Sequence, residues 1–132
     1  MYVNEGKIDF RGNWPEAWTT IGIGKEVAKV GEWAHFAVSW DQKKVSFYFN
    51  GELDSKFDWV GPFKDTDAAL AIAADPAGGD EPLNGFVDKV GMFDDALEKN
   101  EIQRAMKGLE NFLPVESSGR GSTTWGEIKE YR

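Results

Sequence analysis

Two aromatic-rich runs on either side of a short polar turn constrain the fold of this chain more than any other feature. In each run the large apolar residues occupy alternate positions, which is the period of a strand with one buried face. The intervening "DQKK" has about the length of a hairpin turn, so we predict two antiparallel strands whose apolar faces coincide. The members of this face are Phe36, Val38 and Trp40 in the first run and Val45, Phe47 and Phe49 in the second.

A second turn closes the second run. Asn50 and Gly51 form the strongest short hairpin signal in the chain, because both residue types tolerate positive φ. We therefore expect "ELDSKFDWV" to fold back as the next strand. Other strands are expected in "TTIGIG" and over Tyr2–Phe10, Ala68–Ala74 and Gly85–Phe93, with Gly31 opening the first strand of the aromatic hairpin.

The hydrophobic period changes from two to that of a helix in "DDALEKNEIQRAMKG". Asp95 and Glu98 have the spacing of a capping box, and Gly108 is suited to the end of a helix. Many short strands followed by one short C-terminal helix predict an all-β sandwich or barrel.

Length, charge and composition exclude several classes of protein. The 132 residues fit one domain, which we place at 1–113, followed by a polar tail at 114–132 in which Trp125 is expected to dock on the domain or on another molecule. The net charge of −8 disfavours nucleic acid and anionic membranes as partners. No apolar run approaches the ~20 residues that span a bilayer, and the opening "MYVNEGKIDF" is no signal peptide. Without cysteine there is no disulfide or thiolate metal site.

Three segments in order resemble the laminin G-like domains of the concanavalin A-like lectin and glucanase superfamily. "GEWAHFAVSWD" is similar to their G-x-W-x-H-x-A-x-x-[WY]-D pattern, and "VSFYFNGEL" to their strand that ends in Asn-Gly. "LAIAADPAGGDEPLNGFVDKVGMFDDALEKNEI" is similar to the segment that closes the domain, with Lys89 in place of the usual acid. The resemblance covers Gly31–Ile102.

This resemblance implies a concanavalin A-like jelly roll, an antiparallel β-sandwich with one short C-terminal helix. It also implies an extracellular or cell-surface location, typical of bacterial adhesion and binding modules. The strands that usually precede Met1 in such domains are not in this chain, so we expect a truncated or minimal sandwich. A second copy or a complementing chain is then expected to cover the exposed edges.

An enzyme ranks third among the functions, because the carboxylate pair of a glycoside hydrolase is not found. The family's glucanases carry E-x-D-x-E on one strand, whereas the nearest match here is Glu52, Asp54 and Lys56. No G-x-S-x-G elbow accompanies His35, the single histidine, so we interpret His35 as structural.

Two kinds of candidate site remain. Asp88 is expected on an apolar strand face, where hydrogen bonds or a cation must satisfy it, and Asp75 and Asp80 lie on a nearby glycine-rich loop. These three carboxylates are the candidate calcium ligands. Trp14, Trp18 and Trp59 are the candidate ligand-binding aromatics, because we expect them on loops, while Trp33 and Trp40 are expected in the core. The alternatives for both sets are structural: satisfied carboxylates and aromatics that plug the ends of the sandwich.

The leading hypothesis is a non-catalytic binding or adhesion module that recognises a carbohydrate or a protein through rim loops. The second is a structural domain that self-associates and has no small ligand.

Overall fold

The computed structural model describes residues 1–13, 18–60, 71–73 and 83–111. Within these residues the chain forms two three-stranded antiparallel sheets followed by one short helix, which confirms the predicted sandwich. The first sheet has the order β1-β2-β3 and the second β4-β5-β6. The elements are β1 Tyr2–Asn4, β2 Lys7–Asn13, β3 Trp18–Ile23, β4 Phe36–Trp40, β5 Lys44–Phe49, β6 Glu52–Asp58, α1 Lys99–Lys107 and a 3-10 turn at Leu109–Asn111.

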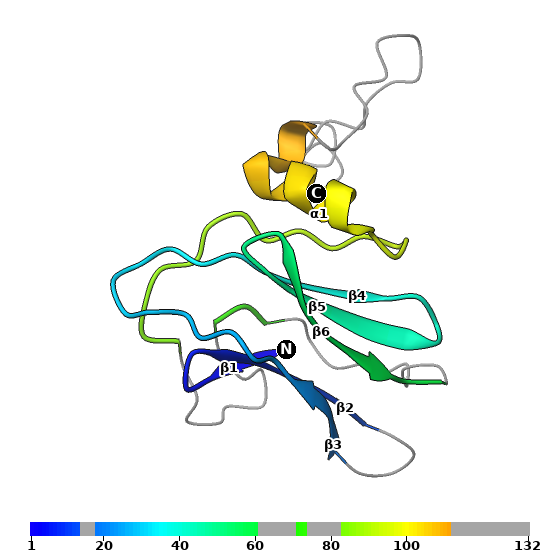
Figure 1. The fold of residues 1–132 in the computed structure, drawn as a ribbon. Coiled ribbons are helices and arrows are strands. Elements are labelled where there is room, and N and C mark those ends of the chain that lie inside the picture. The colour runs from blue at the N-terminus through cyan, green and yellow to red at the C-terminus, as the bar shows by residue number, and fades with distance from the viewer. Residues whose placement is uncertain (14–17, 61–70, 74–82, 112–132) are drawn as a thin grey trace, which may run out of the picture.

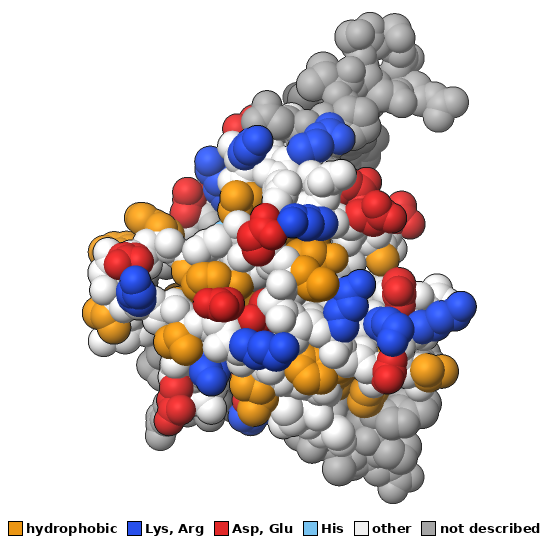
Figure 2. Space-filling model, viewed as in Figure 1, with side chains coloured by type: hydrophobic (Ala, Val, Ile, Leu, Met, Phe, Trp, Pro, Cys, Tyr) orange, Lys and Arg blue, Asp and Glu red, His pale blue; other side chains and the backbone are white. Residues whose placement is uncertain are grey.

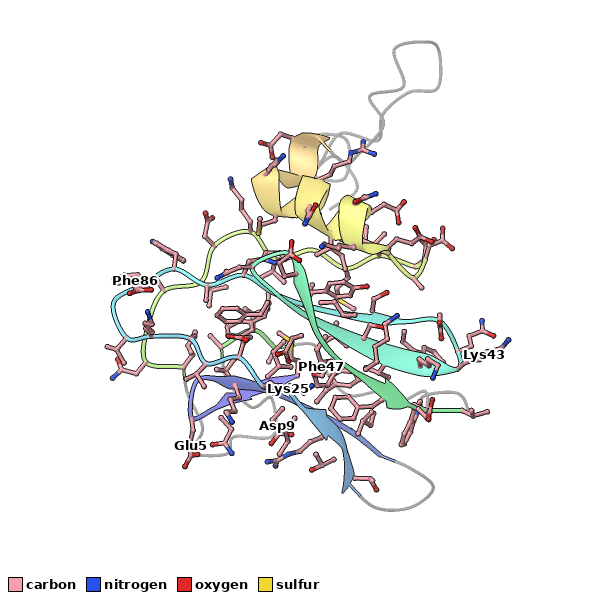
Figure 3. The ribbon with its side chains drawn as sticks, viewed as in Figure 1. Glu5, Asp9, Lys25, Lys43, Phe47 and Phe86 are labelled. Atoms are coloured by element: carbon pink, nitrogen blue, oxygen red, sulfur yellow. The ribbon has the colours of Figure 1, made fainter. Side chains whose placement is uncertain are left out.

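The two sheets stack face to face, and α1 lies on the other side of the second sheet (Figure 1). Phe47 lies between the sheets (Figure 3) and is completely buried, as is Val45. The ring of Phe47 contacts Phe57 of β6 at 5.0 Å between centroids and Phe10 of β2 at 6.3 Å. The core is thus built on the aromatic hairpin, into which the first sheet inserts Ile8 and Ile21.

The register of the aromatic hairpin is the predicted one. Phe36 pairs with Phe49, and Val38 pairs with Phe47. Asn50 and Gly51 form the next turn with φ of 49° and 78°, the two positive values that an Asn-Gly hairpin turn requires. β6 then pairs with β5 as expected.

Three of the expected strands are wrong in extent or in kind. Tyr2–Phe10 is a hairpin rather than one strand, because the chain turns at Glu5 and Gly6, both with positive φ. The aromatic hairpin begins at Phe36, and the five residues from Gly31 are irregular. Gly85–Phe93 is not a strand: no backbone hydrogen bond joins residues 84–92 to other described residues. Most of Ala68–Ala74 lies outside the described residues, and residues 71–73 are not a strand.

The helix begins one turn later than predicted. Glu98, not Asp95, is the N-cap, and its capping box is completed by Glu101, whose carboxylate accepts the backbone N–H of Glu98 at 2.8 Å. Gly108 ends the helix as expected. Ile102 and Ala105 are its buried residues. The domain boundary at residue 113 lies outside the described residues.

Candidate functional site

A pocket of about 250 Å³ lies between the segment that precedes β4 and the turn that follows β5. Its walls combine one exposed indole, one phenyl ring, three charged side chains and one amide. The lining therefore offers both apolar surface and polar groups to a ligand. The lining residues are Glu26, Val27, Lys29, Glu32, Trp33, Ala34, Phe49 and Asn50.

Trp33 is the large aromatic residue of this pocket, and 71% of it is exposed. The prediction that Trp33 belongs to the core is wrong. The strand alternation on which it rested does not reach back beyond Phe36, where β4 begins. Trp40, within β4, does pack against the core as expected.

One wall of the pocket is fixed by Asp54 of β6. The Asp54 carboxylate accepts the backbone N–H of Lys25 at 2.8 Å and that of Glu26 at 2.9 Å. It also accepts the hydroxyl of Ser55 at 2.9 Å. Gly24 precedes this contact, and a Cβ at that position would lie 2.7 Å from the Asp54 carboxylate. The close approach of Asp54 therefore depends on glycine there.

The floor of the pocket is fixed by a reciprocal pair of hydrogen bonds between His35 and Asn50. The backbone N–H of His35 donates to Asn50 Oδ1, and the backbone N–H of Asn50 donates to the His35 carbonyl, both at 2.9 Å. His35 Nδ1 is buried and has no hydrogen-bond partner among the described residues. Burial lowers the pKa of His35 below its ordinary value of 6.5. Burial thus favours the neutral form of the ring.

The charges around Trp33 are only partly paired. Lys29 Nζ lies 3.9 Å from Glu32 Oε1, and both side chains are mostly exposed. No ion pair or side-chain hydrogen bond engages the Glu26 carboxylate within the part of the chain that the structure describes. The pocket therefore holds two carboxylates and one ammonium group.

The three predicted ligand-binding tryptophans do not gather at this pocket as far as the structure describes them. Trp14 and the side chain of Trp18 lie outside the described residues. Trp59 is half-buried and packs against the core, and its carbonyl accepts the indole N–H of Trp40 at 3.4 Å. Their role in binding stays a prediction.

The predicted calcium ligands are likewise not assembled by the described residues. Asp75 and Asp80 lie outside them, while Asp88 is exposed on the unpaired segment rather than set in an apolar strand face. The described ranges contain no group of three or more acidic or histidine side chains that could hold a metal. We therefore derive no chemistry from calcium, and the site stays a prediction.

Comparison with known proteins places this fold in a family. The sequence profile of Laminin_G_3, described as the concanavalin A-like lectin/glucanases superfamily, matches residues 1–103. The chain belongs to this family. The match extends the resemblance seen in the sequence to the first sheet, so the six strands found among the described residues all lie within it.

A solved structure of an S-layer domain-containing protein from Clostridium thermocellum is 25% identical to this laminin G-like chain, with a TM-score of 0.41. The alignment covers 74% of this chain and 50% of that one, so the chain spans half the length of that structure. No curated protein has a significantly similar sequence. Within the described residues, no helix is long and apolar enough to cross a membrane.

Proposed function

We propose that this laminin G-like domain is a non-catalytic module that binds carbohydrate in the pocket beside β4. The observation that carries the proposal is the exposure of Trp33 in a pocket whose walls combine apolar, charged and amide side chains. An aromatic residue exposed to this extent loses the benefit of burial, and a ligand that stacks on it restores that benefit.

Carbohydrate suits the pocket better than a flat protein surface. The indole offers an apolar face to the C–H groups of a sugar ring. Glu26, Glu32 and Asn50 offer acceptors and donors to its hydroxyl groups. Asn50 Oδ1 already accepts the His35 N–H, so its amide group is left to donate. The Asp54 and His35 contacts hold both sides of the pocket in place before a ligand arrives.

The test is a glycan array followed by calorimetric titration of the glycans that are retained. Trp33→Ala should abolish retention, and Trp33→Phe should weaken it because a smaller ring still stacks. Val30→Ala is the matched control, since Val30 is fully exposed nearby but does not line the pocket. Retention that survives Trp33→Ala would contradict the site. Hydrolysis of a retained β-glucan would contradict the non-catalytic assignment.

An extracellular or cell-surface location is part of the same proposal. Glycan recognition by concanavalin A-like domains places such a module where polysaccharides are displayed. Fractionation of cells that express the protein from its own gene tests this location, and recovery in the cytoplasm would count against it.

A second candidate function, self-association, is favoured by one specific surface. Residues 83–93 carry six large apolar side chains that are exposed, among them Phe86 at 89% and Met92 at 77%. Phe86 lies at the periphery in Figure 3. The segment contains one acid, Asp88, and one base, Lys89, so it is neutral within a chain of net charge −8. A second copy of the same segment is therefore the occupant we propose, because a segment without net charge adds no local repulsion between two acidic chains.

Light scattering across a concentration series tests this candidate. A mass that rises with concentration in the unaltered protein and stays monomeric in a Phe86→Ser, Met92→Ser variant would support it. A mass that stays constant at the monomer value would exclude it.

Calcium at Asp75, Asp80 and Asp88 is also a proposal. A cation bound only by the folded chain raises the melting temperature, so the midpoint should fall when chelator is added. An unchanged midpoint would exclude the site.

A further inference from the structure

We propose that the pocket prefers glycans that carry free ammonium groups, namely amino sugars without an N-acetyl group. The inference rests on the proposed carbohydrate-binding function and adds the charge of the ligand to it. It follows from three observations: the balance of charges around the pocket, the face of Trp33, and the carboxylate behind the pocket wall.

The balance of charges leaves the pocket negative. Lys29 and Glu32 are 3.9 Å apart with side chains 76% and 65% exposed, and an ion pair this exposed is weak and easily exchanged. Glu26 has no ionic partner among the described residues, although its backbone is fixed. An incoming ammonium group can therefore pair with Glu26 without displacing a described ion pair, and it can compete with Lys29 for Glu32.

The exposed indole of Trp33 favours the same ligand. The face of an indole carries negative electrostatic potential, and tryptophan is the best of the aromatic residues at attracting a cation. Trp33 lines the pocket together with both glutamates. A sugar that stacks on Trp33 would thus bring its substituents into a region where aromatic face and carboxylates all favour positive charge.

The third contribution to the negative potential of the pocket comes from Asp54, which holds the backbone of Glu26. Asp54 does not itself line the pocket, and its oxygens accept hydrogen bonds from the backbone of Lys25 and Glu26 and from the Ser55 hydroxyl. It is therefore a positioning residue that also adds negative potential beneath Glu26. The net charge of −8 extends the same preference to longer range, where it speeds the approach of cations and slows that of uronic acids.

The test compares three oligosaccharides of equal length: glucosamine, N-acetylglucosamine and galacturonic acid oligomers. Calorimetry on the full chain at about pH 6, where the amines are protonated, gives each dissociation constant. We expect the glucosamine oligomer to bind about threefold to tenfold more tightly than the N-acetylated one, and the uronic acid oligomer to bind least. Added salt should reduce the preference.

Two charge-removing variants localise the effect. Glu26→Gln should bring the ratio of the glucosamine and N-acetylglucosamine affinities toward one. Glu5→Gln removes the same charge from an exposed turn outside the pocket and should leave the ratio unchanged. An equal fall in both variants would assign the effect to overall charge and overturn the inference.

The remaining outcomes separate the inference from the function on which it rests. Equal binding of the glucosamine and N-acetylglucosamine oligomers, both lost in Trp33→Ala, would overturn the ammonium preference and leave the carbohydrate site standing. If none of the three oligomers binds and the glycan array is also empty, the carbohydrate function and the inference both fail.

Discussion

The carboxylate of Asp54 accepts the backbone N–H of Glu26 at 2.9 Å and so ties the segment that lines the pocket to the second sheet. Gly24, two residues before Glu26, is hydrogen-bonded to the first sheet, because its N–H donates to the carbonyl of Ile8 in β2 at 2.7 Å. Asp54 therefore connects the two sheets at the place where the pocket begins.

Asp54→Asn should destabilise the fold and weaken ligand binding together. An amide offers one acceptor oxygen where the carboxylate offers two, and its NH₂ group opposes the backbone donors. We expect a loss of about 1–3 kcal/mol in the free energy of unfolding, measured with urea. Asp58→Asn is the control on the same strand, since Asp58 forms only an exposed ion pair with Lys44 and its loss should change stability little. Equal effects in the two variants would contradict the role of Asp54.

Phe47→Ala should be among the most damaging single substitutions in the described core. Phe47 is completely buried and contacts rings of both sheets, so truncation leaves a cavity and costs about 3–5 kcal/mol. Phe86→Ala makes the same chemical change at a side chain that is 89% exposed and should be nearly neutral for the monomer. Chemical denaturation of both variants checks the difference, and comparable losses would refute the assignment of the core.

Stability should fall as the pH drops below about 6.5, the ordinary pKa of histidine. Burial lowers the pKa of His35 in the folded chain, so the unfolded chain binds its proton first. The stabilisation is complete above the unfolded pKa and is lost between that value and the lower folded pKa. Over this pH range the melting temperature of the unaltered protein should depend more steeply on pH than that of His35→Gln. Because the chain has a single histidine, an equal pH dependence of the melting temperature in the two proteins would show that His35 does not titrate as described.

Two substitutions at Asn50 separate its backbone role from its side-chain role. Asn50→Gly keeps the positive φ of 49° but removes the acceptor of the His35 N–H, which should cost about 1 kcal/mol. Asn50→Ala removes the acceptor and also places alanine, which tolerates the left-handed region less well than asparagine or glycine, at this position, for about 1 kcal/mol more. Thermal unfolding gives the order of stabilities. If the glycine variant is as unstable as the alanine variant, the hydrogen bond rather than the turn conformation accounts for the loss.

The sequence predicts the aromatic hairpin well because its signals are local and agree with one another. Alternation sets the buried face, and Asn50-Gly51 sets the turn and therefore the register. The hairpin at Glu5 and Gly6 was missed because glutamate seldom adopts positive φ, although Gly6 itself was a usable signal. Apolar alternation likewise predicted a strand at Gly85–Phe93, but a strand needs a partner, and the described chain supplies none.

The pocket was not predictable from local patterns. Trp33 continues the alternation of β4 in the sequence, and nothing local shows that the strand starts only at Phe36. Its walls are set by contacts between distant residues, such as Asp54 with Glu26 and His35 with Asn50. Surface charge gives no better signal, since acidic, basic and apolar side chains are interspersed over the face drawn in Figure 2.

The turn at Asn50 and Gly51 touches more than the pocket. The Gly51 carbonyl accepts the side-chain amide of Gln103 at 3.1 Å, and the next residue, Glu52, pairs with Lys99 at 2.6 Å, so the same turn seats α1. A sugar bound against Asn50 would restrain that turn, and the restraint would extend to α1 through these contacts. Ligand binding in the pocket should therefore slow amide hydrogen exchange along α1.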